Sequence, residues 1–258
     1  MPLETLVVVY LALVGLIVGS YLNVVIHRLP RGESTVLPRS RCPACGAAIR
    51  ARDNLPVVSW LLLGGRCRRC RAPISFRYPL VEAATAALFV ACYLRFGASV
   101  DALAGVILGG LLIVLAGIDT AHYYLPDRLT LPGIAVGIAL QPWLSRGSVA
   151  EGIQGALLGG GLLLAVAGVW VLLHGREGMG LGDAKMLAMI GAFLGWRGVV
   201  VSLVAATAAG AAAGLVLLGR RRGGWDRRLP FGLFLALGAL VALLWGRELV
   251  AAYARQLG

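Results

Sequence analysis

Two aspartates at the ends of apolar segments are the residues most able to do chemistry. Asp183 follows Gly180 and Gly182 in the stretch 173–196, where an apolar segment begins, and Asp119 ends another apolar run. Ionisable groups at such borders are costly and usually functional. Two carboxylates can share a water, with one ionised to take its proton and the other protonated to polarise a carbonyl. The pair predicts an aspartyl hydrolase that needs no metal, with Asp119 and Asp183 catalytic.

The glycines before Asp183 have a role of their own in this interpretation. Gly180 and Gly182 permit backbone conformations that are closed to other residues. They would let the chain turn tightly into the next helix and let an extended substrate pass close to the backbone. We expect them to form an active-site loop.

Both aspartates also have a simpler structural interpretation. Asp183 could cap a helix beginning at Ala184, because an acidic side chain satisfies unpaired amides and complements the helix dipole. Asp119 could be an interfacial residue paired with Arg128. Asp127 competes with Asp119 for the catalytic role, but its Pro-Asp turn is more typical of a cap for the apolar segment that starts near Leu129.

Two CxxC pairs indicate a metal site. Cys42 and Cys45 form the first pair, Cys67 and Cys70 the second, and 21 residues separate the pairs. Each pair can form a knuckle that offers two thiolates, and two knuckles complete a tetrahedral zinc site. A site closed by four thiolates predicts structural zinc that folds its loop. A disulfide framework is the alternative, whereas Cys92 lies in an apolar span and is expected to be a small lipid-buried residue.

The composition is that of a polytopic membrane protein. Of 258 residues, 59% are hydrophobic and 14% charged, and the mean hydropathy is +0.84, outside the range of soluble domains. We predict an all-α integral membrane protein with about eight transmembrane helices, or seven if 185–196 is re-entrant. The expected spans are 5–27, 79–96, 101–118, 130–146, 152–173, 185–196, 198–218 and 230–252.

The basic residues predict an orientation. Loop 28–77 holds eleven arginines against Glu33 and Asp53, so the positive-inside rule places this loop, with its zinc site, in the cytoplasm. Because consecutive spans cross the membrane in opposite directions, Asp119, at the end of the third span, and Asp183, at the start of the sixth, then lie on the same cytoplasmic face. The membrane orientation accounts for the net charge of +12, because basic residues gather on the cytoplasmic side. We therefore do not expect nucleic acid as a partner. Anionic lipid headgroups are the expected partner of the arginines, and the sequence assigns no oligomeric state.

Nearly the whole chain resembles one known family, the bacterial prepilin peptidases, or type IV prepilin leader peptidases. The segments that carry the resemblance are 19–30 (GSYLNVVIHRLP), 42–45 (CPAC), 53–60 (DNLPVVSW), 67–70 (CRRC), 73–75 (PIS), 78–82 (YPLVE), Asp119, 125–127 (LPD), 178–183 (GMGLGD) with Lys185, and 230–232 (PFG). The four cysteines and both aspartate motifs, in this order, are highly specific.

The resemblance implies a membrane-embedded aspartyl peptidase of the GxGD type, with Asp119 and Asp183 at its catalytic positions. It implies a location in the bacterial inner membrane. Its substrates would be type IV prepilins or type II secretion pseudopilins, cut on the cytoplasmic face between a basic leader and the following hydrophobic helix.

The resemblance also implies a second activity, N-methylation of the newly exposed residue with S-adenosyl-L-methionine. No glycine-rich motif after a strand identifies a cofactor pocket. Asn23, Asn54 and Glu82, near the cysteine loop, are candidate contributors, although Glu82 could instead neutralise Arg77 or a helix dipole.

The expected domains follow from these assignments: a first transmembrane helix at 1–27, a zinc-binding, methyltransferase-associated loop domain at 28–78, and a membrane-embedded peptidase domain at 79–258. Two other functions stay open at this point. One is a peptidase whose zinc loop is purely structural, and the other is a non-enzymatic membrane scaffold or transporter whose aspartates only cap helices.

Overall fold

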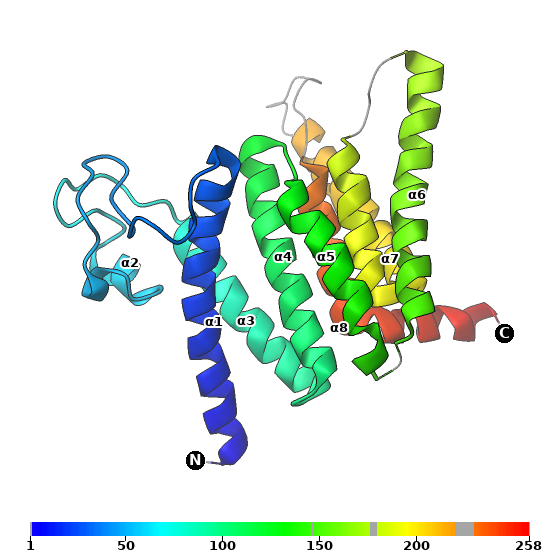
Figure 1. The fold of residues 1–258 in the computed structure, drawn as a ribbon, viewed down its shortest axis with the longest axis horizontal. Coiled ribbons are helices and arrows are strands. Elements are labelled where there is room, and N and C mark those ends of the chain that lie inside the picture. The colour runs from blue at the N-terminus through cyan, green and yellow to red at the C-terminus, as the bar shows by residue number, and fades with distance from the viewer. Residues whose placement is uncertain (1, 146, 176–179, 220–229, 258) are drawn as a thin grey trace. The chain divides into compact units, whose positions relative to one another are not determined.

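The described part of the protein is helical, as the computed structural model in Figure 1 shows. The structure describes residues 2–145, 147–175, 180–219 and 230–257. Its helices are α1 (Leu3–Arg28), α2 (Val58–Leu62), α3 (Arg77–Phe96), α4 (Val100–His122), α5 (Asp127–Leu140), α6 (Val149–His174), α7 (Leu181–Gly219) and α8 (Phe231–Leu257), with 3-10 turns η1 (Leu29–Arg31), η2 (Ala51–Asp53) and η3 (Gln141–Trp143). The chain packs as two compact units, Met1–Gly97 and Ala98–Gly258.

In the first unit, α1 and α3 pack closely and antiparallel. Gly19 of α1 lies against Glu82 of α3, and Gly15, one turn earlier, lies against Ala86, one turn later. A Cβ at Gly15 would come within 2.6 Å of the Ala86 Cα atom, so glycine is what lets these backbones approach. The long loop between the helices therefore begins and ends at the same end of the pair.

The second unit contains a sharp break in α7. Gly195 has φ 67° and ψ −177°, which divides α7 into two arms. A Cβ at Gly191 would lie 2.8 Å from Val199 Cγ2, although these residues would be ~12 Å apart in an unbroken helix. The chain therefore doubles back at Gly195, and a positive φ of this kind favours glycine.

The prediction of an all-α protein with about eight membrane helices is confirmed in outline. By length and composition, six of the described helices can cross a membrane: α1 with η1, α3, α4, α6, α7 and α8. The 14-residue α5 is ~21 Å long, shorter than a bilayer core of ~30 Å. When α5 and the two arms of α7 are counted separately, the helices follow the order of the eight predicted spans. The break at Gly195 falls close to the expected boundary between spans 185–196 and 198–218.

Close helix packing holds the first arm of α7 in place. Glycines of α6 lie against its backbone, with Gly155 facing Gly191 and Gly159 facing the Leu187 carbonyl. Near the break, the buried Gln141 side chain donates from Nε2 to the carbonyls of Ala192 (2.7 Å) and Phe193 (3.3 Å). Backbone groups inside a membrane need such internal partners.

Candidate functional site

Asp119 lies in the last turn of α4 and is buried, with 6% of its surface exposed. The helix ends at Tyr123, which adopts a left-handed conformation and donates its N–H to the Asp119 carbonyl at 2.8 Å. The Asp119 Oδ2 atom has no hydrogen-bond partner, and no ion pair joins this carboxylate to Arg128. A buried carboxylate oxygen without a partner is costly, and this atom is shielded from solvent in the structure.

Asp183 lies in the first turn of α7, which begins at Leu181. Its N–H donates to the Gly180 carbonyl at 3.2 Å. A Cβ at Gly182 would come within 2.9 Å of the Leu125 Cβ, so this glycine lets the first turn of α7 approach the segment that follows α4. The interpretation of Asp183 as a cap for a helix starting at Ala184 is not what the structure shows, because the helix starts before Asp183.

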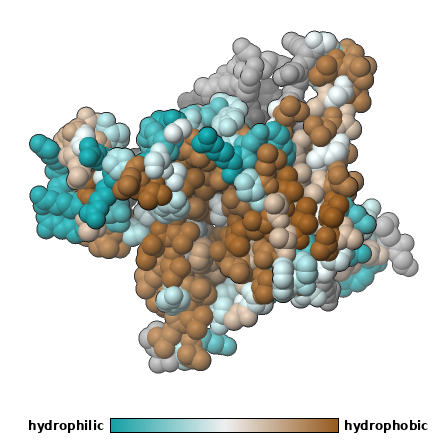
Figure 2. Space-filling model, viewed as in Figure 1, coloured by the Kyte–Doolittle hydropathy of each residue, from teal (hydrophilic) through white to brown (hydrophobic). Residues whose placement is uncertain are grey.

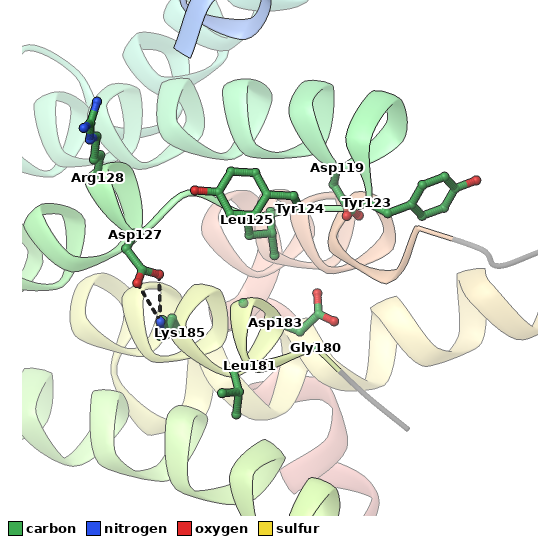
Figure 3. Close-up of a pocket in the computed structure, with 11 residues that line it drawn as sticks. Asp119, Tyr123, Tyr124, Leu125, Asp127, Arg128, Gly180, Leu181, Asp183 and Lys185 are labelled. Atoms are coloured by element: carbon green, nitrogen blue, oxygen red, sulfur yellow. Dashed lines mark hydrogen bonds and ion pairs between the residues drawn. The ribbon is translucent and has the colours of Figure 1, made fainter. Parts of the chain in front are cut away.

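The two aspartates line one pocket of 520 Å³, together with the segment after α4 and the loop before α7. Figure 3 shows their carboxylates directed into the space between α4 and α7. The pocket residues are Asp119, Tyr123, Tyr124, Leu125, Asp127, Arg128, Gly180, Leu181, Gly182, Asp183 and Lys185. Both predicted catalytic residues and both predicted loop glycines therefore meet at a single site.

Asp127 occupies the same pocket in a different role. It is the first residue of α5, where its charge complements the helix dipole, and its carboxylate accepts from Lys185 Nζ at 2.7 and 2.8 Å. This ion pair ties the start of α5 to the start of α7 (Figure 3). The helix begins two residues before the expected Leu129, and no side-chain cap forms there.

The start of α8 forms a further wall beside Asp119. A Cβ at Gly232 would come within 2.7 Å of the Asp119 Oδ2 atom, so only glycine leaves room for the carboxylate. The sequence pattern includes this residue in the segment 230–232 but assigns it no role. A glycine at the start of a long apolar helix is the signal that could have drawn attention to it.

The four cysteines of the first unit come together as predicted. Their Sγ atoms all lie within 4.8 Å of one another, and Cys42 and Cys70 are 3.8 Å apart. All four are free thiols in the structure, so the alternative of a disulfide framework is not what is observed. The cluster can bind a metal ion, and its all-sulfur donor set fits a closed site.

The two knuckles have the same local construction. In each, the first cysteine accepts and donates backbone hydrogen bonds across the turn, with Cys42 bonded to Ala47 and Gly46, and Cys67 to Ala72 and Arg71. Hydrogen bonds from the backbone N–H groups of Cys70 and Arg69 hold the pKa of the Cys67 thiol below its usual range, at about 6. Thiolate is the metal-binding form, and the turn favours it at Cys67, whereas desolvation and the neighbouring thiols raise the pKa of the Cys70 thiol in the same knuckle to about 11.

Further contacts fix the cysteine loop to itself and to its helices. Arg68 makes a two-pronged ion pair with Asp53, at 3.0 and 2.7 Å, and this partner holds the pKa of the Asp53 carboxyl below its usual range. Glu82 accepts from the Val57 N–H at 2.7 Å, and Asn23 donates to the Tyr78 carbonyl at 3.0 Å. The predicted pairing of Glu82 with Arg77 is therefore not observed.

Of the three candidates for methylation, Glu82 and Asn23 are buried and Asn54 is exposed. Glu82 joins α3 to the loop, whereas Asn23 joins α1 to the first turn of α3. Val57, which Glu82 contacts, has an unusual φ of 59°. For a β-branched residue such a conformation is strained. The carboxylate of Glu82 therefore stabilises a backbone turn that the loop alone would avoid.

Taken together, the fold and site define a polytopic helical membrane protein with a carboxylate-lined pocket and a four-cysteine lobe. Residues 13–96 match the bacterial peptidase A24 N-terminal domain, and residues 106–215 match the type IV leader peptidase family. The chain belongs to the type IV leader peptidase family.

Relatives of similar length are similar in sequence to this chain along most of its length. Proteins named prepilin leader peptidase/N-methyltransferase are 41% identical in Burkholderia pseudomallei (90% of this chain, 83% of the relative), 39% in Stutzerimonas stutzeri and 38% in Pseudomonas aeruginosa (93% and 91% for both). No solved structure gave a significant match.

Proposed function

We propose that this protein removes the leader peptide of prepilins or pseudopilins with Asp119 and Asp183, and then N-methylates the new N-terminal residue. Peptidase and methyltransferase activity follow from its family and from the names of its relatives. The assignment of the two aspartates is supported by one observation above all: the end of α4 and the start of α7 place both carboxylates in the same pocket.

The proposed cleavage needs one water between the two carboxylates. The ionised aspartate takes a proton from the water, and the protonated one donates a hydrogen bond to the scissile carbonyl, so the attacking oxygen and the developing oxyanion are both stabilised. The proton then passes to the leaving amine. Both residues lie at the ends of apolar helices, where water is accessible and where a substrate with one apolar helix would place the bond after its leader.

Zinc is the metal proposed for the four cysteines, with all of its ligands supplied by Cys42, Cys45, Cys67 and Cys70. Four sulfur ligands leave no open position, so the metal would hold the lobe folded. S-adenosyl-L-methionine is the proposed methyl donor and would supply the transferred methyl group. The described part of the first unit contains no strand followed by a glycine-rich turn, so no contact residues are named for it.

The protein is multi-pass by the length and composition of its helices. We place it in the bacterial inner membrane with the cysteine lobe and the pocket facing the cytoplasm, supported by the arginines of loop 28–77. The functional domains proposed are the first transmembrane helix (1–27), the zinc-binding lobe (28–78) and the peptidase domain (79–258).

The test uses the purified full-length protein in lipid nanodiscs, with a prepilin whose leader ends in glycine and with S-adenosyl-L-methionine. Mass spectrometry of the product compares the wild type with Asp119→Asn, Asp183→Asn and Asp127→Asn. We expect only the first two to lose cleavage, and the wild-type product to be heavier by one methyl group. Normal cleavage by both would favour the scaffold interpretation, in which these residues are structural.

A cleaved but unmethylated wild-type product would support the second interpretation, a peptidase with a structural zinc lobe. Binding of S-adenosyl-L-methionine to the wild type, measured by calorimetry, separates this outcome from a methyltransferase that fails only because the product is released too early.

A further inference from the structure

Helix α2 (Val58–Leu62) uses one side to hold the cysteine lobe together. The buried Ser59 hydroxyl accepts from the Leu55 N–H at 2.9 Å and donates to the Arg52 carbonyl at 3.0 Å. Trp60 donates from Nε1 to the Ile74 carbonyl at 3.0 Å, and its ring stacks edge-on against Phe76. The inward side of α2 is therefore fully engaged in the lobe.

The other side of α2 is apolar and exposed. Val58, Leu61 and Leu62, here called the α2 face, are 49%, 64% and 80% exposed. Their spacing of three and four residues places them on one side of the helix. Exposed apolar clusters outside the membrane-spanning helices mark contact surfaces.

The surroundings of the α2 face are basic. The Ser59 hydroxyl donates to the Arg52 carbonyl, and the Arg66 N–H donates to the carbonyl of Leu63, the residue that follows α2. Both arginines are exposed. The lobe has further exposed arginines at 39, 41, 50, 69 and 71, whereas its Asp53 is already paired with Arg68. Figure 2 shows hydrophobic and hydrophilic residues side by side on this lobe. Apolar side chains bordered by free arginines suit the surface of an anionic bilayer.

The position of the lobe within its unit suits the same partner. The loop leaves α1 and enters α3 at the same end of two helices that can span a membrane. Figure 1 shows α2 beside the upper part of α1 instead of beyond its end. Because α1 and α3 can cross a bilayer, a short helix held at this height along α1 would meet the lipid instead of lying above it in solvent.

We propose that the α2 face inserts into the lipid bilayer beside α1, while the surrounding arginines contact anionic headgroups. The occupant is the membrane that the protein itself spans. This anchoring would hold the cysteine lobe on the bilayer surface whether or not the lobe takes part in methylation, so the inference does not depend on the proposed function.

The experiment is site-specific photocrosslinking in the full-length protein. Leu62 is replaced by p-benzoylphenylalanine, the protein is reconstituted in nanodiscs of phosphatidylethanolamine and phosphatidylglycerol, and lipid adducts are measured by intact mass. The same replacement at Leu172, an exposed residue of the membrane-spanning α6, is the positive control. Replacement at Ala48, an exposed and uncharged loop residue, gives the background.

We expect lipid adducts at position 62 at a yield within about twofold of position 172 and at least fivefold above position 48. Background yield at 62, or a crosslink from 62 to residues 98–258 or to an added prepilin peptide, would overturn the proposal. A bound-zinc measurement on each labelled protein verifies that the lobe is folded.

A second pair of measurements separates the apolar and the charged contributions. With the crosslinker at Val58, the double variant Leu61→Ser, Leu62→Ser should reduce the lipid adduct at least fivefold with unchanged zinc content. Replacing phosphatidylglycerol with phosphatidylcholine should reduce the adduct at 62 at least threefold and leave the adduct at 172 unchanged. An unchanged yield in the first case refutes insertion of the α2 face, and in the second it refutes the role of the arginines.

Discussion

The aspartate pocket of the second unit and the cysteine cluster of the first are assembled in opposite ways. Each cysteine pair is made by a local turn in which backbone hydrogen bonds aim two sulfurs at one point. The aspartates come from separate helices and meet only because α4, α5, α7 and α8 pack together. The cluster should therefore depend on its ligands and metal, and the pocket on helix packing.

The largest expected effect is on cleavage by Asp119→Asn or Asp183→Asn. Either change removes one half of the proposed general acid–base pair, which should lower the cleavage rate by about 10³-fold. The measurement is single-turnover cleavage of a prepilin in nanodiscs. Methylation of a peptide that is already cleaved should stay within twofold of the wild type, because that reaction is assigned to the other unit. Equal loss of both activities would contradict this separation.

The reciprocal change is the removal of one metal ligand from each knuckle. The double variant Cys42→Ser, Cys67→Ser should lose bound zinc and unfold the lobe, because metal binding and folding are coupled. Methylation should fall at least 100-fold and cleavage less than tenfold, measured on the same preparations. Replacement of the buried Cys92 by Ser, outside the cluster, should retain zinc and serves as the control.

Helix packing is tested at the start of α8. Gly232→Ala would place a methyl group 2.7 Å from the Asp119 Oδ2 atom and displace the carboxylate. We expect kcat for cleavage to fall roughly 100-fold, because a small displacement of a reacting group can lower the rate by about this factor. KM should change less than threefold. The matched control is Gly210→Ala, where the new Cβ would be 3.7 Å from the Phe234 ring, an ordinary contact. Similar activity of the two variants would show that Gly232 does not position Asp119.

The smallest expected effect concerns the ion pair between Asp127 and Lys185. Its side chains are 53% and 36% exposed, and an exposed pair contributes ~0.2–1 kcal/mol. Asp127→Asn should therefore lower kcat for cleavage less than tenfold. The exchange Asp127→Lys, Lys185→Asp should recover at least half of the loss. If Asp127→Asn abolishes cleavage as Asp119→Asn does, Asp127 belongs to the catalytic group and its predicted structural role is wrong.

Several parts of this molecule follow from short-range patterns. The apolar runs predict the order of the helices, and the glycine at 195 lies close to the boundary expected between the short span 185–196 and the span 198–218. The CxxC spacing predicts the sulfur cluster, since two residues between cysteines are enough to close a knuckle. The resemblance of segments along the chain pointed to the family that the comparisons then identified.

Other features could not be obtained in this way. The Glu82 side chain was expected to neutralise Arg77 or the helix dipole, and the structure shows it accepting from the Val57 N–H of the loop. Asp127 was expected to cap a helix at Leu129 and instead begins the helix and pairs with Lys185 of α7. Each of these partners lies on another element, and its distance in the sequence carries no information about its distance in space.

The sequence by itself determined the membrane class, the helix order, the pairing of the four cysteines in two knuckles and the two aspartates as residues of interest, because hydrophobic length and cysteine spacing act within one element. Only the tertiary structure decided that both carboxylates share a pocket, that Gly232 lies against Asp119, and that the α2 face is left uncovered within the described lobe. Glycine contacts and helix breaks set how closely two helices approach each other. That distance also depends on every other helix packed against the pair, so no single segment of the sequence determines it.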